Sequence, residues 1–209
     1  TLIGNIVSGL FNSMKISAKE IAQIGQYSEN IYFGKPSGLM DQMTCSVGGF
    51  VFIDFSNPAE PKIEKIESDL PDYSICVTDT KNVSGDLNSE YLMIVSEMKS
   101  IATELGKEFL NDVDKDEFEK NIAVLRNKCS DRAILRAMHF FSENERVLKV
   151  SKALKKEDLE KFIKLEKESG NSSFMYLQNV CSPTEYLKQD LSLALAISEQ
   201  VLTKEEACR

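Results

Sequence analysis

The spacing of apolar residues changes along this chain from a helical period to an alternating one and then back. Ile3 and Leu10 belong to a helical pattern, whereas the stretches 50–55 and 61–67 alternate apolar and polar residues around the turn "SNPAEP". From Leu87 onward the helical period returns. Helices, a strand pair and further helices in this order predict an α+β fold that is rich in helix and has a few antiparallel strands.

Local signals set the limits of several elements. Ser17 and Glu20 form a capping box, Ser37 can cap a short third helix that the glycine pair 48–49 would end, and Ser182 is expected to cap the last helix. The expected helices cover about 3–12, 17–32, 37–47, 87–105, 115–128, 131–149, 157–168 and 184–201.

A break near "SDLPD" separates two predicted domains, residues 1–70 and 71–209. The stretch 73–80 is expected to be a strand, which would pair with the first domain or with strands beyond Arg209. One stripe of the helix that follows is expected to face the core, and it consists of Tyr91, Val95, Met98, Ala102 and Leu105.

Composition excludes several classes of partner. The net charge is −8 and acids alternate with lysines, so there is no basic stripe for nucleic acid. No apolar run approaches the roughly 20 residues of a membrane span, and the five cysteines are scattered, so we expect a cytoplasmic protein with reduced thiols. The helical pattern is already running at Thr1, which suggests a piece of a longer protein.

Two other patterns carry no function by themselves. The acids "DVDKDE" at 112–117 lack the glycine and the final glutamate of a calcium loop. His139 lies among apolar residues, where a packed, hydrogen-bonded imidazole is commoner than a base, and a zinc site would lack further ligands.

The stretch "GKPSGLMDQ" at 34–42 is the candidate site. Asp41 falls in the first turn of the expected helix, where a carboxylate can simply interact with the helix dipole, worth about 0.3–1 kcal/mol. Gly38 would leave room for a ligand beside it. Glu29, with Gly25 four residues earlier on the same surface, could join Asp41 as a metal-and-base pair, or both acids could be surface carboxylates.

This stretch resembles the galactokinase pattern G-x-P-C/S-G-I/L-M-D-Q of the GHMP small-molecule kinases. The segments "SEN", "VFIDF", "LNSEY", "SDRAILRAMHFFSENERV" and "ESGNSSFMYLQN" follow in the order expected for that family. The resemblance implies a GHMP kinase-like, two-domain remnant. Residues 1–70 would be the C-terminal part of the N-terminal domain, and residues 71–209 an incomplete C-terminal domain.

The resemblance also implies roles for four residues. Asp41 would accept or orient the proton of the sugar's C1 hydroxyl, Gly38 would contact the sugar through its backbone, and Tyr91 would flank the sugar with its phenol. Glu29 would be a ligand of Mg²⁺. The implied reaction is the phosphorylation of galactose by ATP, with a carboxylate orienting a poorly nucleophilic hydroxyl.

Parts of the family pattern are missing or altered. The N-terminal sugar motif, the phosphate loop and the C-terminal glycine-rich motif are not in the sequence, so this piece alone is expected to be inactive and could self-associate through uncovered apolar faces. Ile94 and Val95 stand where many galactokinases have two arginines. An inactive galactokinase-like sugar-sensing or regulatory module, or a GHMP kinase for another sugar, remains an alternative.

Overall fold

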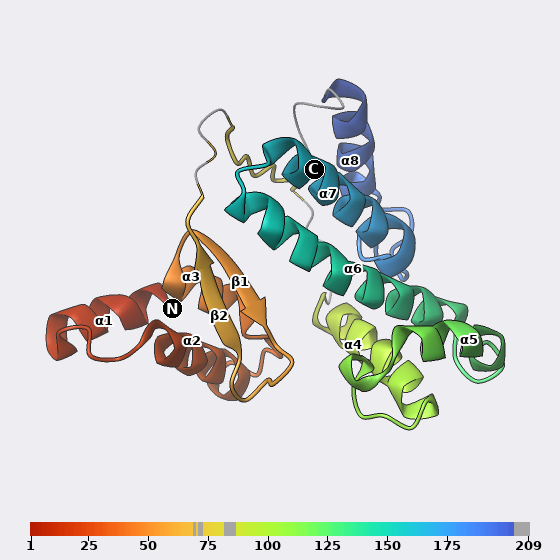
Figure 1. Ribbon diagram of the computed structural model, residues 1–209, viewed down its shortest axis with the longest axis horizontal. Helices are drawn as coiled ribbons and strands as arrows, with labels where there is room; N and C mark the ends of the chain where they lie inside the picture. Colours follow the sequence, from red (N-terminus) through yellow and green to blue (C-terminus); the bar gives the residue numbers. More distant parts are fainter. Residues whose placement is uncertain (69, 71–72, 82–86, 203–209) are drawn as a thin grey trace. The chain divides into compact units, whose positions relative to one another are not determined.

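The computed structural model describes residues 1–68, 70, 73–81 and 87–202 of the chain. These residues form two compact units, Thr1–Asp69 and Leu70–Arg209, which we call unit 1 and unit 2 (Figure 1). Each unit is described by itself.

Unit 1 consists of helices followed by a β-hairpin (Figure 1). The elements are α1 (Leu2–Asn12), α2 (Ala18–Tyr27), the π-helical turn η1 (Ser28–Tyr32), α3 (Met40–Val47), β1 (Phe50–Asp54) and β2 (Lys62–Ile66). The strands are antiparallel and pair from Phe50–Ile66 to Asp54–Lys62, which confirms the predicted strand pair. Buried side chains of α2, α3 and the residue before α3 form the core, namely Ala22, Met43 and Leu39.

The ends of these helices follow local signals in part. The Ser17–Glu20 capping box is present, and Gly48 ends α3 with a positive φ of 76°, as predicted. The prediction that Ser37 caps α3 is wrong, because the helix begins at Met40 and Leu39 occupies the N-cap position. The Ser37 hydroxyl instead donates a hydrogen bond to Glu29 of η1.

Helix α1 leaves much of its apolar surface exposed. The exposed side chains are Leu2, Ile3, Ile6, Leu10 and Phe11. An exposed helix face of this kind is typical of a surface that packs against another polypeptide segment. Self-association of the 209-residue chain therefore stays a prediction.

Unit 2 is helical throughout its regular elements. They are α4 (Leu87–Glu104), the 3₁₀ turn η2 (Leu110–Asp112), α5 (Lys115–Leu125), α6 (Asp131–Lys155), α7 (Leu159–Ser172), the π-helical turn η3 (Ser173–Leu177) and α8 (Asp190–Val201). The long helix α6 packs against both α4 and α7 (Figure 1). Its core joins α4, α5 and α6 through a cluster that includes Ile101, Ala102, Phe118, Leu125 and Phe141.

The buried stripe of α4 differs from the predicted one at its N-terminal end. Met98, Ala102 and Leu105 contact the core, but Tyr91 and Val95 are 60% and 64% exposed. The hydrophobic cluster lies against the C-terminal half of the helix. Nearer its start Tyr91, Leu92 and Val95 are exposed, while Met93 and Ile94 are partly buried. Packing therefore does not account for Tyr91.

Two further predictions for unit 2 are wrong. Residues 73–80 form no strand, and within the described chain no strand pairs with them; Val77 is 94% exposed. An extended apolar segment needs a partner for its backbone groups before it becomes a strand. Helix α8 begins at Asp190 rather than near 184, because Ser182 caps a turn, accepting hydrogen bonds from the amides of Thr184 and Glu185.

A polar layer joins α6 to α7. His139 is buried, and its Nδ1 lies 2.9 Å from the Ser172 Oγ, which confirms the predicted packed, hydrogen-bonded imidazole. The Ser169 hydroxyl donates to the Glu143 carboxylate at 2.8 Å. Burial lowers the pKa of His139, and the positive charge of Arg146 lowers it further.

This imidazole predicts how stability depends on pH. Since the pKa of His139 is lower in the folded chain, the unfolded chain takes up the proton first, and the free energy of unfolding should fall as pH drops from about 7.5 to about 5.5. Urea denaturation should show a smaller fall in His139→Gln. Burial raises the pKa of Glu166, and this shift makes the folded chain more stable as pH drops. Chains with His139 and with His139→Gln should therefore both be compared in a Glu166→Gln background. Equal pH slopes with and without His139 would contradict the prediction.

Candidate functional site

The loop before α3 is tied to the end of α2 through Ser37. The Ser37 amide donates to the Asn30 Oδ1 at 2.8 Å, and the Ser37 carbonyl accepts from the side chains of Gln26 and Asn30 at 3.1 and 3.3 Å. The Ser37 hydroxyl donates to the Glu29 Oε2 at 2.5 Å. These contacts fix the backbone immediately before Gly38.

Glu29 connects the same loop to α3. Its Oε1 accepts from the buried Gln42 side chain at 3.0 Å, and its Oε2 lies 3.6 Å from the Lys35 Nζ. The hydrogen bond from Ser37 lowers the pKa of Glu29, and those from Gln42 and Lys35 act in the same direction. Glu29 is therefore ionised at neutral pH, and it binds the 35–42 segment through Lys35, Ser37 and Gln42.

Asp41 is exposed in the first turn of α3, as predicted. Among the described residues, no hydrogen-bond donor or cation contacts its carboxylate. A Cβ added at Gly38 would meet nothing within 4 Å, so the space beside the loop is open. The result is an accessible carboxylate on an anchored helix start, which can accept a proton from an external hydroxyl.

Gly25 has a packing role rather than an open face. A Cβ at this position would lie 3.1 Å from the Thr1 Oγ1 and 3.5 Å from the Gln42 Cγ. The absent side chain lets α2 approach the start of α1 and the buried Gln42.

The chemistry around Glu29 is compatible with Mg²⁺, although no described group of three or more His, Cys, Asp or Glu side chains is arranged as a complete metal site. Mg²⁺ in phosphoryl-transfer sites keeps several waters and takes only one or two protein carboxylates, together with substrate phosphates. Glu29 is ionised and has part of its side chain exposed. The nearby Lys35 ammonium would compete with the ion for the same carboxylate.

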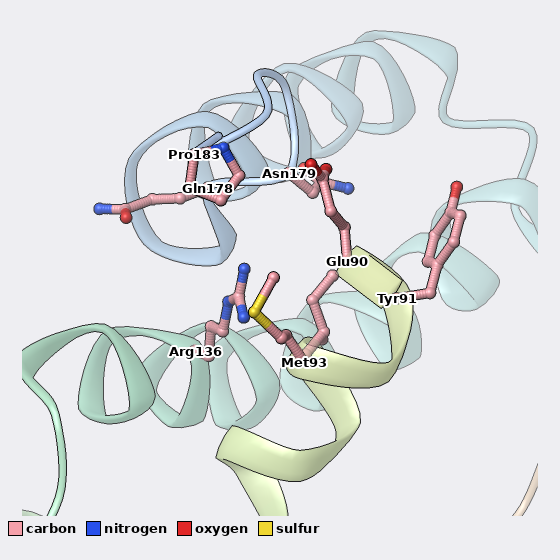
Figure 2. A pocket seen from close by; sticks show the side chains of 8 residues that line it. Glu90, Tyr91, Met93, Arg136, Gln178, Asn179 and Pro183 are labelled. Atoms are coloured by element: carbon pink, nitrogen blue, oxygen red, sulfur yellow. The ribbon is translucent and has the colours of Figure 1, made fainter. Parts of the chain in front are cut away.

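Tyr91, the remaining predicted site residue, lies in unit 2 on the exposed side of α4. It is at the edge of an open pocket between α4, α6 and the segment after η3. Figure 2 shows Glu90 and Arg136 reaching toward the segment of Asn179 and Pro183, while Tyr91 points away from Arg136.

Beneath this pocket, two arginines of α6 share one carboxylate of α4. Glu97 accepts from Arg132 at 2.6 Å and from Arg136 at 2.8 Å, and the Arg136 Nε also donates to the Leu177 carbonyl at 3.0 Å. The Arg136 side chain is only 4% exposed. Burial lowers the pKa of Arg136, whereas the hydrogen bond with Glu97 raises that of Arg132.

Sequence reasoning assigned no role to this charged cluster, or to Gln26 and Asn30, which bind the Ser37 backbone. Arg132 and Arg136 are four residues apart and so share a helix face, which is the one local signal that could have indicated them. Their partner Glu97 is 35 and 39 residues away along the chain.

Comparison with known proteins bears on both units. The family of GHMP kinases, N-terminal domain, matches residues 2–49, a range that contains Glu29, Gly38 and Asp41. A galactokinase of Lactobacillus helveticus is 32% identical over 178 residues, or 82% of this chain and 44% of that protein. A galactokinase of Limosilactobacillus reuteri is 33% identical over 171 residues, or 78% of this chain and 42% of that protein.

The chain belongs to the GHMP kinase family. The fold agrees: the crystal structure of Lactococcus lactis galactokinase complexed with galactose matches 96% of this GHMP kinase chain and 50% of that one, with a TM-score of 0.72 and 24% identity. The predicted helix-rich, GHMP kinase-like α+β fold is thereby confirmed.

The GHMP kinase chain spans less than half the length of these curated relatives. No helix in the described part of the chain is both long and apolar enough to cross a bilayer.

Proposed function

We propose that the complete protein phosphorylates galactose with ATP to give galactose 1-phosphate. The similarity to galactokinases supports the substrate pair. The observation that carries the proposal is the exposed Asp41 carboxylate three residues after Gly38, where the space around the backbone is open, on a segment that the Ser37–Glu29 hydrogen bond holds in place.

In the proposed reaction, Asp41 orients the C1 hydroxyl of the sugar and accepts its proton as the oxygen attacks the γ-phosphorus of ATP. The bond from that phosphorus to the β–γ bridging oxygen breaks, and ADP leaves with the bonding electrons. A sugar hydroxyl is a weak nucleophile, and most of the catalysis of phosphoryl transfer comes from alignment and charge neutralisation. The Gly38 backbone contacts the sugar where a side chain would intrude. The Tyr91 phenol flanks the sugar, which gives a function to an aromatic ring that packing leaves exposed.

Glu29 is the residue of unit 1 proposed to hold Mg²⁺, which when bound neutralises charge on the phosphates of ATP. Its lowered pKa keeps it ionised for that purpose. The 209 residues alone are expected to bind ATP poorly, since none of the ten glycines lies in a run resembling the family's phosphate loop.

The test is an assay of the complete gene product with galactose and Mg-ATP, together with a panel of other hexoses and amino sugars. Formation of galactose 1-phosphate supports the proposal, and absence of any phosphorylated sugar contradicts it. Ile94 and Val95, in place of the two arginines of many galactokinases, favour a second candidate: a kinase for another sugar, which would turn over a different member of the panel.

Gly38 offers a way to separate sugar binding from folding. Since a Cβ here meets nothing and the backbone φ is not in the left-handed region, Gly38→Val should change the free energy of unfolding by less than about 0.5 kcal/mol. The KM for galactose should rise about tenfold, because branched methyl groups occupy the space proposed for the sugar. Initial-rate kinetics and thermal denaturation measure the two effects. An unchanged KM for galactose would mean that the sugar does not bind in this space.

A further inference from the structure

We propose that Ser182 and Glu90 are positioning residues that set the direction of Tyr91 toward the sugar. This inference rests on the proposed function, since it concerns the same reaction. It begins from the way α4 is attached to unit 2. The C-terminal half of α4 is buried in the core through Ile101 and Ala102, but apolar residues in its N-terminal half, including Tyr91 and Val95, are exposed.

Polar contacts hold the inner side of α4 as well. In the middle of the helix the Glu97 carboxylate is bound by Arg132 and Arg136, and two turns before it Glu90 accepts a hydrogen bond from the Ser182 hydroxyl. A helix end with little apolar packing frays readily, because short helical segments are marginal on their own. The Ser182–Glu90 contact is the one of these closest to Tyr91 in sequence.

The geometry around Ser182 directs its proton to Glu90. The Ser182 oxygen accepts hydrogen bonds from the amides of Thr184 and Glu185 at 3.2 and 3.3 Å. The Thr184 hydroxyl also lies 2.8 Å from the Ser182 oxygen. Ser182 has one proton to donate, and because a carboxylate is a stronger acceptor than a hydroxyl, that proton goes to Glu90. A hydrogen bond to an ionised group is stronger than one between neutral groups.

Ser182 is itself on an anchored segment. Arg136 donates to the Leu177 carbonyl at the end of η3, and Gln178 follows in the left-handed conformation with a φ of 55°. The segment that turns there also lines the pocket against Glu90 and Arg136 through Asn179 and Pro183 (Figure 2). A fixed segment thus binds the inner side of the helix.

Because successive side chains on an α-helix are rotated by about 100°, holding Glu90 on the inner side fixes the direction in which its neighbour Tyr91 leaves the helix. Loss of the hydrogen bond would let the first turns of α4 move while the rest of the fold stays intact. The expected defect is therefore in sugar binding and not in the binding of ATP.

The experiment uses the complete gene product with Ser182→Ala and Glu90→Ala. We expect the KM for galactose to rise on the order of tenfold in each, the size of effect that follows from losing a hydrogen bond to a charged group, with the KM for ATP and kcat close to wild type. Ser182→Thr and Glu90→Gln keep a hydroxyl donor and an oxygen acceptor, and should restore most of the affinity.

Glu104→Gln is the matched control, since it removes an exposed ion pair with Lys128 from the other end of the same helix. Hydrogen exchange should accelerate in residues 90–97 of Ser182→Ala but not of Glu104→Gln, a readout that requires no kinase activity. An unchanged KM for galactose in Ser182→Ala would overturn the inference. So would an equal rise in the KM for ATP, which would indicate a general loss of structure. A wild-type protein without kinase activity would instead contradict the proposed function.

Discussion

An Asp41→Asn variant of the complete gene product is expected to lose between about 10² and 10⁴ of its kcat with galactose, the range for removal of a positioned base. The substitution keeps the shape of the side chain and removes the charge that accepts the proton. Because Asp41 is exposed and touches no described donor or cation, folding should be little affected. Initial rates at saturating galactose and Mg-ATP measure the loss.

Unit 2 supplies a matched control for this variant. Asp116 is also an exposed acid at the second position of a helix, in α5, so Asp116→Asn removes a carboxylate from an equivalent place relative to the helix dipole. Both variants should lose about 0.3–1 kcal/mol of stability. If Asp41→Asn turned over at the same rate as Asp116→Asn, the carboxylate of Asp41 would be a helix-dipole contact and nothing more.

The largest effect on stability is expected for Glu97→Ala. This change leaves the guanidinium of Arg136, which is almost fully buried, and that of Arg132 without their shared acceptor. Removing one partner of a buried ion pair typically costs about 3–5 kcal/mol, because the remaining charge stays in a poorly solvated place. A loss of that size should lower the thermal unfolding midpoint of unit 2 by roughly 10 °C.

Thermal and urea denaturation measure this loss, with Glu104→Ala as the control on the same helix. The ion pair of Glu104 with Lys128 is exposed, and such pairs contribute about 0.2–1 kcal/mol. Glu97→Gln keeps an oxygen acceptor and should fall between the two. A Glu97→Ala variant as stable as Glu104→Ala would mean that water or another acceptor replaces the carboxylate.

The parts of the fold that could be predicted from sequence are those encoded within a few residues. The Ser17–Glu20 capping box, the end of α3 at Gly48 and the β-hairpin all depend on contacts between near neighbours. The position of Asp41 in a first helical turn is of the same kind. Such signals act before the rest of the chain is in place, so they can be read from a short stretch.

Two of the predictions that failed concern serines whose hydroxyls bind residues outside the local signal. Ser37 could have capped α3, but its hydroxyl binds Glu29 of η1 instead. Ser182 has the local sequence of a helix cap, but its hydroxyl also binds Glu90, 92 residues away along the chain. Hydrogen bonds between side chains that are far apart in the sequence leave no periodic pattern of residues. The binding of Glu97 by two arginines was not predicted for the same reason.

The two π-helical turns have a consequence for how this family can vary in length. Each turn closes a hydrogen bond five residues back, from Phe33 to Ser28 and from Gln178 to Ser173, and so contains one residue more than an α-helical turn. Deleting that residue would let ordinary α-helix form, but would rotate everything after it by about 100° and shorten the path by about 1.5 Å. Ser37 could then no longer meet Glu29. Gaps in alignments of related chains should therefore avoid these turns and collect in hairpin loops such as 56–61.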